Sequence, residues 1–157
     1  MRVGIGYDSH RFEDGRRLVL GGVVVPHARG LIGHSDADAV AHAVTDALLG
    51  AAALGDIGQH FPPGNERWRD ANSIDLLQRA VTLVRDAGLR PVNVDVTVVC
   101  EAPRIAPHVP AMRARLARAL GVDVTAVSVK GKSNEQMGWI GRGEGLVALA
   151  VAAVTDA

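Results

Sequence analysis

Residues 2–10 read RVGIGYDSH, and the rest of the fold is organised around this stretch. Apolar residues alternate with glycines over 2–7, which predicts a short strand that another backbone or a ligand can approach closely. Asp8 and His10 lie two residues apart, so on an extended chain both side chains point to the same face. His42, on a helix packed over this strand, would complete an Asp/His/His site. Three protein ligands with an open fourth position are typical of catalytic zinc.

Two interpretations of these side chains remain open. In the first, Asp8, His10 and His42 hold a metal, and Asp46 accepts a hydrogen bond from the other nitrogen of the His42 ring. In the second, His10 bonds its neighbour on the strand, and His42 is satisfied by Asp38 or Asp46 on the same helix face. The first interpretation makes the protein a metalloenzyme.

Periodicity and turn residues predict a single α/β domain over residues 1–157. Expected strands are 2–7, 18–25, 92–99, 124–129 and 146–154, with the second paired to the first, and expected helices are 37–53, 73–87 and 107–120. Ser35 or Asp36 is expected to cap the first helix and Ser73 the second, while Gly121 ends the third.

The order of these elements favours an α+β sandwich, in which helices cover one face of a mixed sheet. The strand at 146–154 is apolar on both faces, so either helices or a second subunit must cover its outer face. We therefore expect a close-packed oligomer.

Composition narrows the class of protein. The chain has 17 basic and 17 acidic residues, and this zero net charge argues against a nucleic-acid partner. The arginines within 113–118 alternate with alanine and leucine, which is typical of a solvated helix face. Cys100 is the single cysteine, so an internal disulfide and a cysteine zinc cage are excluded. Its place at the end of a strand predicts a buried, inert thiol.

The sequence also bears on location. No uncharged apolar run reaches the length of a membrane span, and no basic-then-apolar leader is visible at the N-terminus. We expect a cytoplasmic protein without a membrane partner.

Three loops combine glycine with polar or charged residues. His34, Ser35 and Asp36 form either an ordinary helix cap or, with the exposed helix amides, a phosphate site. The loop 130–135 offers lysine, serine and amides for an anion, and Glu135 for a hard divalent ion. The loop 141–145 is either a tight connector or a phosphate-binding loop in which Arg142 faces a phosphate. Neither a dinucleotide-binding glycine pattern nor a serine-hydrolase elbow occurs.

Six motifs occur in order along the chain: GYDSH at 6–10, GHSDAD at 33–38, HAVTDALLG at 42–50, LGDIG at 54–58, NVDVT at 93–97 and GRGEG at 141–145. Together they resemble the 2-C-methyl-D-erythritol 2,4-cyclodiphosphate synthase family over almost the whole length. The resemblance implies a homotrimer of ferredoxin-like α/β subunits with active sites at the subunit interfaces. It also implies a phosphorus–oxygen lyase of the non-mevalonate isoprenoid pathway. In its substrate, 4-diphosphocytidyl-2-C-methyl-D-erythritol 2-phosphate, the 2-phosphate attacks the β-phosphate and CMP leaves.

The resemblance also assigns residues. It implies zinc at Asp8, His10 and His42, magnesium or manganese at Glu135 bridging the diphosphate, and catalytic roles for His34 and Ser133. The implied substrate-binding residues are Asp8, His10, His34, Ser35, Asp56, Ile57, Gly58, Phe61, Asn65, Ala102, Pro103, Arg104, Lys132, Ser133, Asn134, Glu135, Trp139 and Arg142.

Two other functions use the same residues. A metal-dependent phosphohydrolase would activate water at the open metal position and release inorganic phosphate. A non-enzymatic carrier would hold an isoprenoid diphosphate in a central trimer cavity lined by Arg142. The reaction product separates the cyclase from both.

Overall fold

A computed structural model describes all residues, 1–157, and a five-stranded sheet lies at its centre. The strands are β1 (Arg2–Asp14), β2 (Leu18–Leu20), β3 (Val23–Val25), β4 (Arg29–Leu31), β5 (Leu89–Val99), β6 (Val127–Lys132) and β7 (Gly145–Asp156). The α-helices are α1 (Ala39–Ala51), α2 (Ile57–His60), α3 (Ser73–Asp86), α4 (Val109–Leu120) and α5 (Gly138–Gly141). Short 3₁₀ turns occupy Glu66–Trp68, Ala106–His108 and Val124–Ala126.

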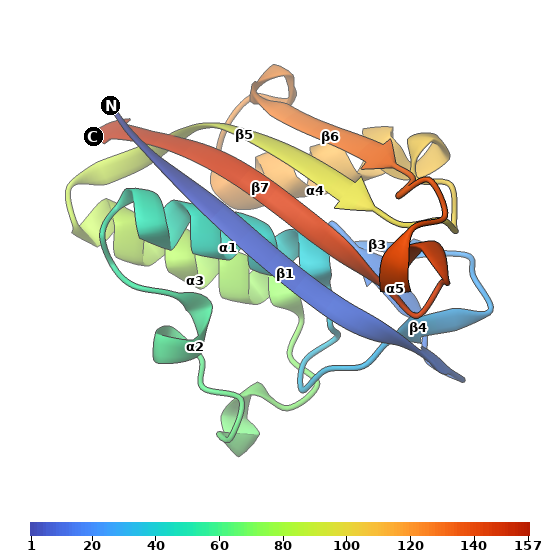
Figure 1. Cartoon of the computed structure of the whole chain (residues 1–157). Helices are drawn as coiled ribbons and strands as arrows, with labels where there is room; N and C mark the ends of the chain where they lie inside the picture. The colour runs from blue at the N-terminus through green and yellow to red at the C-terminus, as the bar shows by residue number, and fades with distance from the viewer.

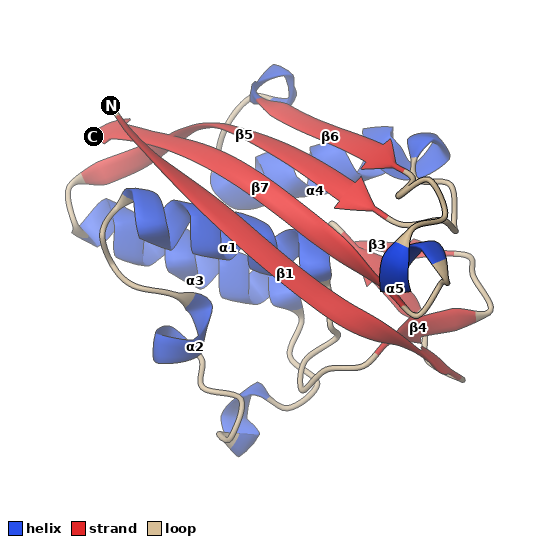
Figure 2. Ribbon diagram, in the orientation of Figure 1, coloured by secondary structure: helices blue, strands red, loops and turns tan.

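The sheet is mixed, with strand order β4-β1-β7-β5-β6. The β5–β6 pair is parallel and the other pairs are antiparallel. Helices α1, α3 and α4 all lie on one face of this sheet (Figures 1 and 2). This confirms the predicted architecture of a mixed sheet with helices on one face. None of the helices is both long enough and apolar enough to cross a membrane.

Glycines on β1 allow α1 to lie directly on the strand. A Cβ built on Gly4 would collide with the backbone of Ala47 and Ala51, and one on Gly6 with the carbonyl of Ala43. Only residues without a side chain fit this approach. The close packing confirms the interpretation of the glycines at 2–7 and holds the second turn of α1 over the end of the strand that carries the polar residues.

The expected single strand at 18–25, paired with β1, is wrong. Residues 18–25 form a separate hairpin, in which β2 pairs with β3 and the chain reverses at Gly21 and Gly22, both with positive φ. The Asp38 carboxylate holds this turn by accepting from the Gly21 and Gly22 amides at 2.8 and 2.7 Å. The Gly-Gly pair between two short apolar runs is a hairpin signal, so the sequence contained the information needed.

Several predicted boundaries also change. Asp38, not Ser35 or Asp36, caps α1, since its side chain accepts from the Ala41 amide at 3.0 Å. Asn72, not Ser73, caps α3. The predicted strand at 124–129 begins with a 3₁₀ turn and becomes extended only at Val127, and β1 is longer than predicted. Gly121 ends α4 in the left-handed conformation, as predicted.

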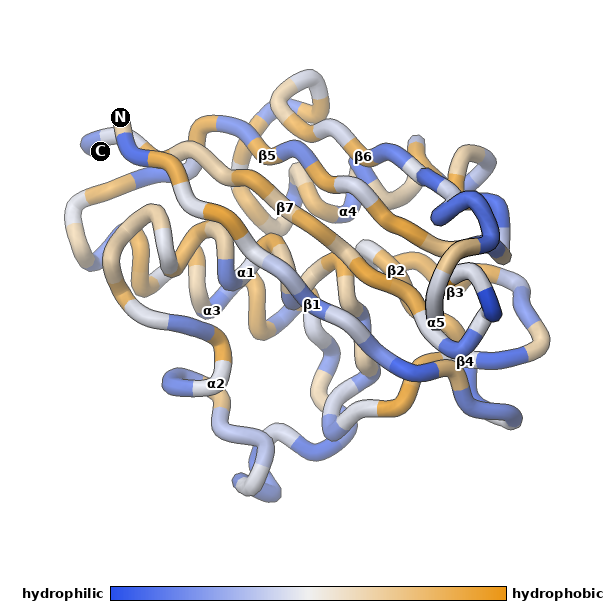
Figure 3. The backbone as a smooth tube through the Cα atoms, viewed as in Figure 1, coloured by the Kyte–Doolittle hydropathy of each residue, from blue (hydrophilic) through white to orange (hydrophobic).

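The part of the sheet face opposite the helices that β1 and β7 form is apolar and uncovered. Its exposed side chains are Val3, Ile5 and Tyr7 of β1, at 65%, 72% and 56%, and Leu149 and Val151 of β7, at 36% and 45%. Figure 3 shows the hydrophobic character that runs along β7 through the middle of the sheet. Helices do not cover this face, so one of the two covers expected for the last strand is excluded. Contiguous apolar surface of this kind marks an interaction site.

Candidate metal centre and active site

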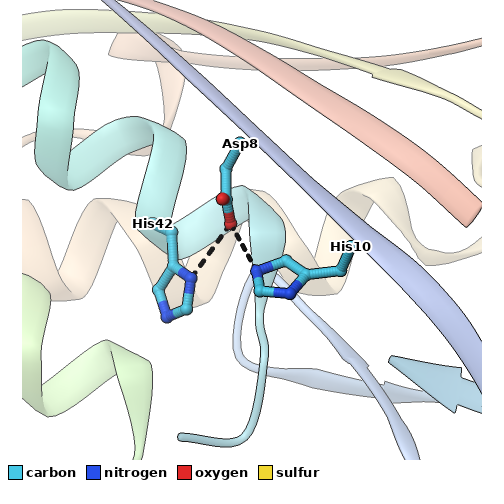
Figure 4. Close-up of side chains that lie close together, drawn as sticks. All are labelled: Asp8, His10 and His42. Atoms are coloured by element: carbon cyan, nitrogen blue, oxygen red, sulfur yellow. Dashed lines mark hydrogen bonds and ion pairs between the residues drawn. The ribbon is translucent and has the colours of Figure 1, made fainter. Parts of the chain in front are cut away.

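Asp8 and His10 of β1 and His42 of α1 converge on one point. Asp8 Oδ2 lies 2.7 Å from His10 Nε2 and 3.0 Å from His42 Nδ1, and Figure 4 shows both rings directed at this single oxygen. All three ligand atoms lie within 4.8 Å of one another. Zinc bound tetrahedrally at about 2.0–2.1 Å separates its ligand atoms by about 3.3 Å, so these side chains fit the ion with small adjustments.

The far nitrogen of each ring is also held. His10 Nδ1 donates to the Ile32 carbonyl at 2.6 Å, and His42 Nε2 lies 2.8 Å from the Ser73 hydroxyl. Such second bonds fix which nitrogen is free to ligate and how the ring is turned. Asp46, the predicted outer partner of His42, instead accepts from the Ile57 amide at 2.8 Å, because the chain following α1 turns back against it.

The side chains of the site alter one another's ionisation. Burial raises the pKa of Asp8, but hydrogen bonds and charges from His10 and His42 outweigh this and hold it below its usual value. Burial lowers the pKa of His10, and the Asp8 carboxylate outweighs this and raises it. The triad therefore stabilises a positive charge beside Asp8, the position where a bound cation would replace the histidine protons.

A cavity of about 220 Å³ opens beside the triad and is called the triad cavity here. Seven predicted site residues line it: His10, His34, Ser35, His42, Ile57, Gly58 and Phe61. Pro63, Trp68 and Leu76 complete the wall. The sequence did not point to Trp68 or Leu76, because nothing distinguishes an apolar cavity wall from core before folding.

Asp56 and Asn65 lie on the loop that borders the triad cavity. Asp56 caps α2 by accepting from the Gln59 amide at 2.9 Å. The Asn65 carbonyl accepts from His34 Nε2 at 3.2 Å, so this loop is joined to the residue predicted to be catalytic. Both residues therefore lie near the predicted site. Within a single subunit, however, their side chains stabilise the loop itself.

A second cavity, of about 260 Å³, lies where the parallel strands β5 and β6 end and is called the strand-end cavity. Pro103, Arg104, Lys132 and Ser133 of the predicted site line it, and Ala102 immediately precedes Pro103. Cys100 lies in its wall, only 5% exposed, and burial raises the pKa of its thiol to about 11. The expected burial of the thiol is confirmed, and the raised pKa agrees with the low reactivity expected of it.

The turn after β6 contains the predicted second metal ligand. Ser133 Oγ donates to Glu135 Oε1 at 3.0 Å, and Glu135 and Gln136 both have positive φ, 51° and 60°. The Glu101 carboxylate accepts from the amides of Asn134 and Gln136, both at 3.0 Å. Glu101 therefore fixes the backbone around Glu135, a role that the sequence did not indicate.

Trp139 and Arg142 belong to the segment around α5. Trp139 lines a third cavity with Ser9, His10, Arg11 and Glu144. Arg142 is 63% exposed and donates through Nε to Glu144 at 2.8 Å.

A single chain does not assemble the whole predicted site. The triad cavity and the strand-end cavity share no lining residue. Their strands β1 and β6 are separated in the sheet by β7 and β5, which is a distance of about 14 Å at the usual strand spacing. Asp8, His10 and His42 form the only cluster of three candidate metal ligands, and Glu135 is not part of it.

Comparisons with known proteins identify the family of the chain. The sequence model of the YgbB family matches residues 1–155. The 2-C-methyl-D-erythritol 2,4-cyclodiphosphate synthase of Symbiobacterium thermophilum is 59% identical and is covered over 98% of both chains. That of Chromobacterium violaceum is 56% identical over 99% of both chains.

Two solved structures have the same fold. One, described as the CDP-bound form of 2C-methyl-D-erythritol-2,4-cyclodiphosphate synthase, is similar with a TM-score of 0.90 and 36% identity, over 98% of this chain and 100% of the other. The second is the bifunctional IspDF of Campylobacter jejuni, with a TM-score of 0.96 and 38% identity. This chain is matched over 99% of its length but spans only 42% of that longer protein.

Proposed function

The chain belongs to the YgbB family, and we propose that it catalyses the ring closure for which its curated relatives are named. The enzyme converts 4-diphosphocytidyl-2-C-methyl-D-erythritol 2-phosphate to 2-C-methyl-D-erythritol 2,4-cyclodiphosphate and CMP. This step belongs to the non-mevalonate isoprenoid pathway, and the enzyme is a phosphorus–oxygen lyase. The single cysteine agrees with a reducing compartment, and we place the reaction in the cytoplasm.

The observation that carries the proposal is the convergence of Asp8, His10 and His42 at the wall of an open cavity. We assign zinc to this triad, and magnesium or manganese to Glu135 together with the substrate diphosphate. When bound, these cations screen the repulsion between the two reacting phosphates and stabilise the charge of the transition state.

The residues of the chain position a reaction that occurs within one molecule. Tethering of both phosphates on one substrate gives effective molarities of roughly 10⁵–10⁸ M in favourable geometries. The attacking phosphate oxygen is already ionised, so no general base is required. His34 and Ser133, which we assign to the transferring phosphate, therefore act as hydrogen-bond donors at developing charge.

Most of the substrate-binding residues lie in or beside one of the two cavities. At the triad cavity we assign Ile57 and Gly58 of its wall and the adjacent Asp56 to the erythritol, and Ser35 to phosphate. In the strand-end cavity we assign Ala102, Pro103 and Arg104 to cytidine and Lys132 to the nucleotide phosphates. The remaining proposed contacts are from Phe61, Asn65, Asn134, Trp139 and Arg142. The relative with bound CDP supports a cytidine nucleotide as the ligand of this fold.

We further propose a homotrimer whose active sites lie between subunits. The uncovered apolar face of β1 and β7 supports an assembly in which a second copy buries it. The separation of the two cavities within one chain supports sites in which the triad cavity of one subunit meets the strand-end cavity of the next. A substrate with phosphates at one end and cytidine at the other would span that junction.

Phosphorus-31 NMR tests the proposed reaction. The purified protein is incubated with the cytidine substrate, zinc and magnesium, and His42→Ala is the matched control. Two coupled cyclic diphosphate resonances together with CMP are the expected products. Release of inorganic phosphate would identify a phosphohydrolase instead, while unchanged substrate would overturn both catalytic assignments and favour the carrier.

A further inference from the structure

The environment of His42 explains how its ring is held for metal binding. One ring nitrogen, Nδ1, lies 3.0 Å from Asp8, where the metal would be held. The other, Nε2, lies 2.8 Å from Ser73 Oγ. Ser73 is fully buried at the first position of α3, although Asn72 already caps that helix. The Ser73 hydroxyl is therefore available for a role other than capping.

A carboxylate orients the Ser73 hydroxyl. Ser73 Oγ donates to Asp36 Oδ1 in a short hydrogen bond, and the Ser73 amide donates to Asp36 Oδ2 at 3.1 Å. A serine hydroxyl has one proton and an ionised carboxylate has none. Because the proton of Ser73 is directed to Asp36, the oxygen of Ser73 must accept from Nε2–H of His42. The Nδ1 atom is then the nitrogen with a lone pair for a metal.

We propose that Asp36 and Ser73 are positioning residues that fix His42 for zinc, as an Asp36–Ser73–His42 relay. The inference rests on the proposed zinc site and adds to it the outer carboxylate of His42. Ligating histidines usually donate their second N–H to a carboxylate, a carbonyl or water. His10 meets this rule through the Ile32 carbonyl, and His42 meets it through a serine oriented by a carboxylate.

The relay connects three separate segments. Asp36 lies in the loop before α1, His42 in the second turn of α1 and Ser73 at the start of α3. The Asp36 amide also donates to the Ala71 carbonyl at 3.1 Å, so the loop is bound to the residues just before α3. Both segments border the triad cavity, and their relative position therefore affects the orientation of the metal ligand.

Two neighbouring side chains provide matched controls. Ser35 Oγ lies 3.1 Å from the same nitrogen of His42, but it has no carboxylate partner. Asp46 is an acid on the same helix one turn after His42, but it bonds the Ile57 amide. Loss of Ser35 tests whether any nearby hydroxyl suffices, and loss of the Asp46 charge tests whether any nearby charge suffices.

Zinc affinity, measured by competition with a chelator, tests the relay. We expect Ser73→Ala and Asp36→Asn each to weaken zinc binding by about 10–100-fold, the usual effect of losing an outer-shell partner. The double variant should be little weaker than Ser73→Ala, because both substitutions break one relay. Ser35→Ala and Asp46→Asn should stay within about 3-fold of the parent chain, because neither removes the partner of His42 that a carboxylate orients.

Thermal unfolding with and without zinc separates positioning from a structural role. A structural role lowers the Tm of both forms equally, whereas the relay reduces the increase in Tm that zinc produces. Zinc binding by Asp36→Asn and Ser73→Ala within about 2-fold of the parent chain would overturn the proposal, as would an equal loss in Asp46→Asn. If Ser73→Ala does not fold, Asp36→Asn decides the question. A parent chain without stoichiometric zinc would instead overturn the zinc site itself.

Discussion

The triad cavity and the strand-end cavity hold their functional side chains in different ways. In the triad, the ligand side chains are only 14–25% exposed, and both histidines have a second hydrogen-bond partner. At the strand end, Lys132, Ser133 and Glu135 are exposed, and the firmest contacts are those that Glu101 makes to backbone amides. The candidate metal centre is therefore preorganised within one chain, whereas the strand-end side chains remain exposed and few contacts hold them in place.

The largest expected effect comes from removing one metal ligand, which should disable the triad cavity and leave the strand-end cavity intact. We expect His42→Ala to lose zinc and to reduce turnover by at least about 10³-fold, because a metal ion supplies several kcal/mol of transition-state stabilisation. Binding of CMP, measured by calorimetry, should remain unchanged because the strand-end cavity is intact. His60→Ala is the matched control, since His60 only bonds the Leu54 carbonyl. Stoichiometric zinc in His42→Ala would show that the ligand assignment is wrong.

Alkylation of Cys100 tests whether the thiol in the wall of the strand-end cavity is unreactive, as expected of a cavity that only binds its ligand. With its pKa raised from 9.0 to about 11, the thiol is ionised in about one molecule in a thousand at pH 8, against about one in ten when unfolded. We expect iodoacetamide to react about 100-fold more slowly with the folded chain than with urea-unfolded chain, and the rate to rise about tenfold per pH unit up to about pH 11. Equal rates at pH 8 would mean that the thiol is accessible in the folded chain and that its pKa is not raised there.

Mixed trimers test whether the two cavities cooperate across subunits. We expect Ser133→Ala to lose about 100-fold in turnover, as for one transition-state donor, and His42→Ala to be inactive. If each site takes its triad from one subunit and its strand end from the next, randomly mixed trimers contain about one quarter intact sites. Co-refolding the two variants should therefore restore about a quarter of the parent turnover. Turnover equal to the average of the separate variants would place each site within one chain.

The sequence predicted those features that depend on neighbours within one element. Asp8 and His10 share a strand face, the glycines of β1 admit a helix, and Gly121 ends α4. Partners from distant segments were missed. Asp38 was a candidate partner of His42 on the same helix face, but it accepts from amides 16 and 17 residues away. Ser73 was expected to cap α3, but its hydroxyl donates to Asp36, 37 residues away. Long-range partners of this kind follow from tertiary packing, which periodicity does not encode.

The smallest expected effect concerns Glu101, which the sequence did not single out. Its carboxylate holds the turn in which Glu135 and Gln136 adopt left-handed backbone, a conformation that costs roughly 1–2 kcal/mol per non-glycine residue. Without that acceptor the turn relaxes and Glu135 moves. We expect Glu101→Ala to weaken Mn²⁺ activation by about 10-fold, since a hydrogen bond to a charged group contributes about 1.5–3 kcal/mol.

A conservative substitution of Glu101 distinguishes the contribution of its hydrogen-bond acceptor from that of its charge. Glu101→Gln keeps an oxygen that can accept from both amides, so its Mn²⁺ activation should stay within about 3-fold of the parent chain. Zinc content should remain stoichiometric in both variants, because the triad holds its own ligands in place. An equal loss in Glu101→Gln and Glu101→Ala would mean that charge at the strand end, rather than the geometry of the turn, controls the second cation. Loss of zinc from either variant would mean that the two cavities are coupled within one chain, against the separation that their contacts indicate.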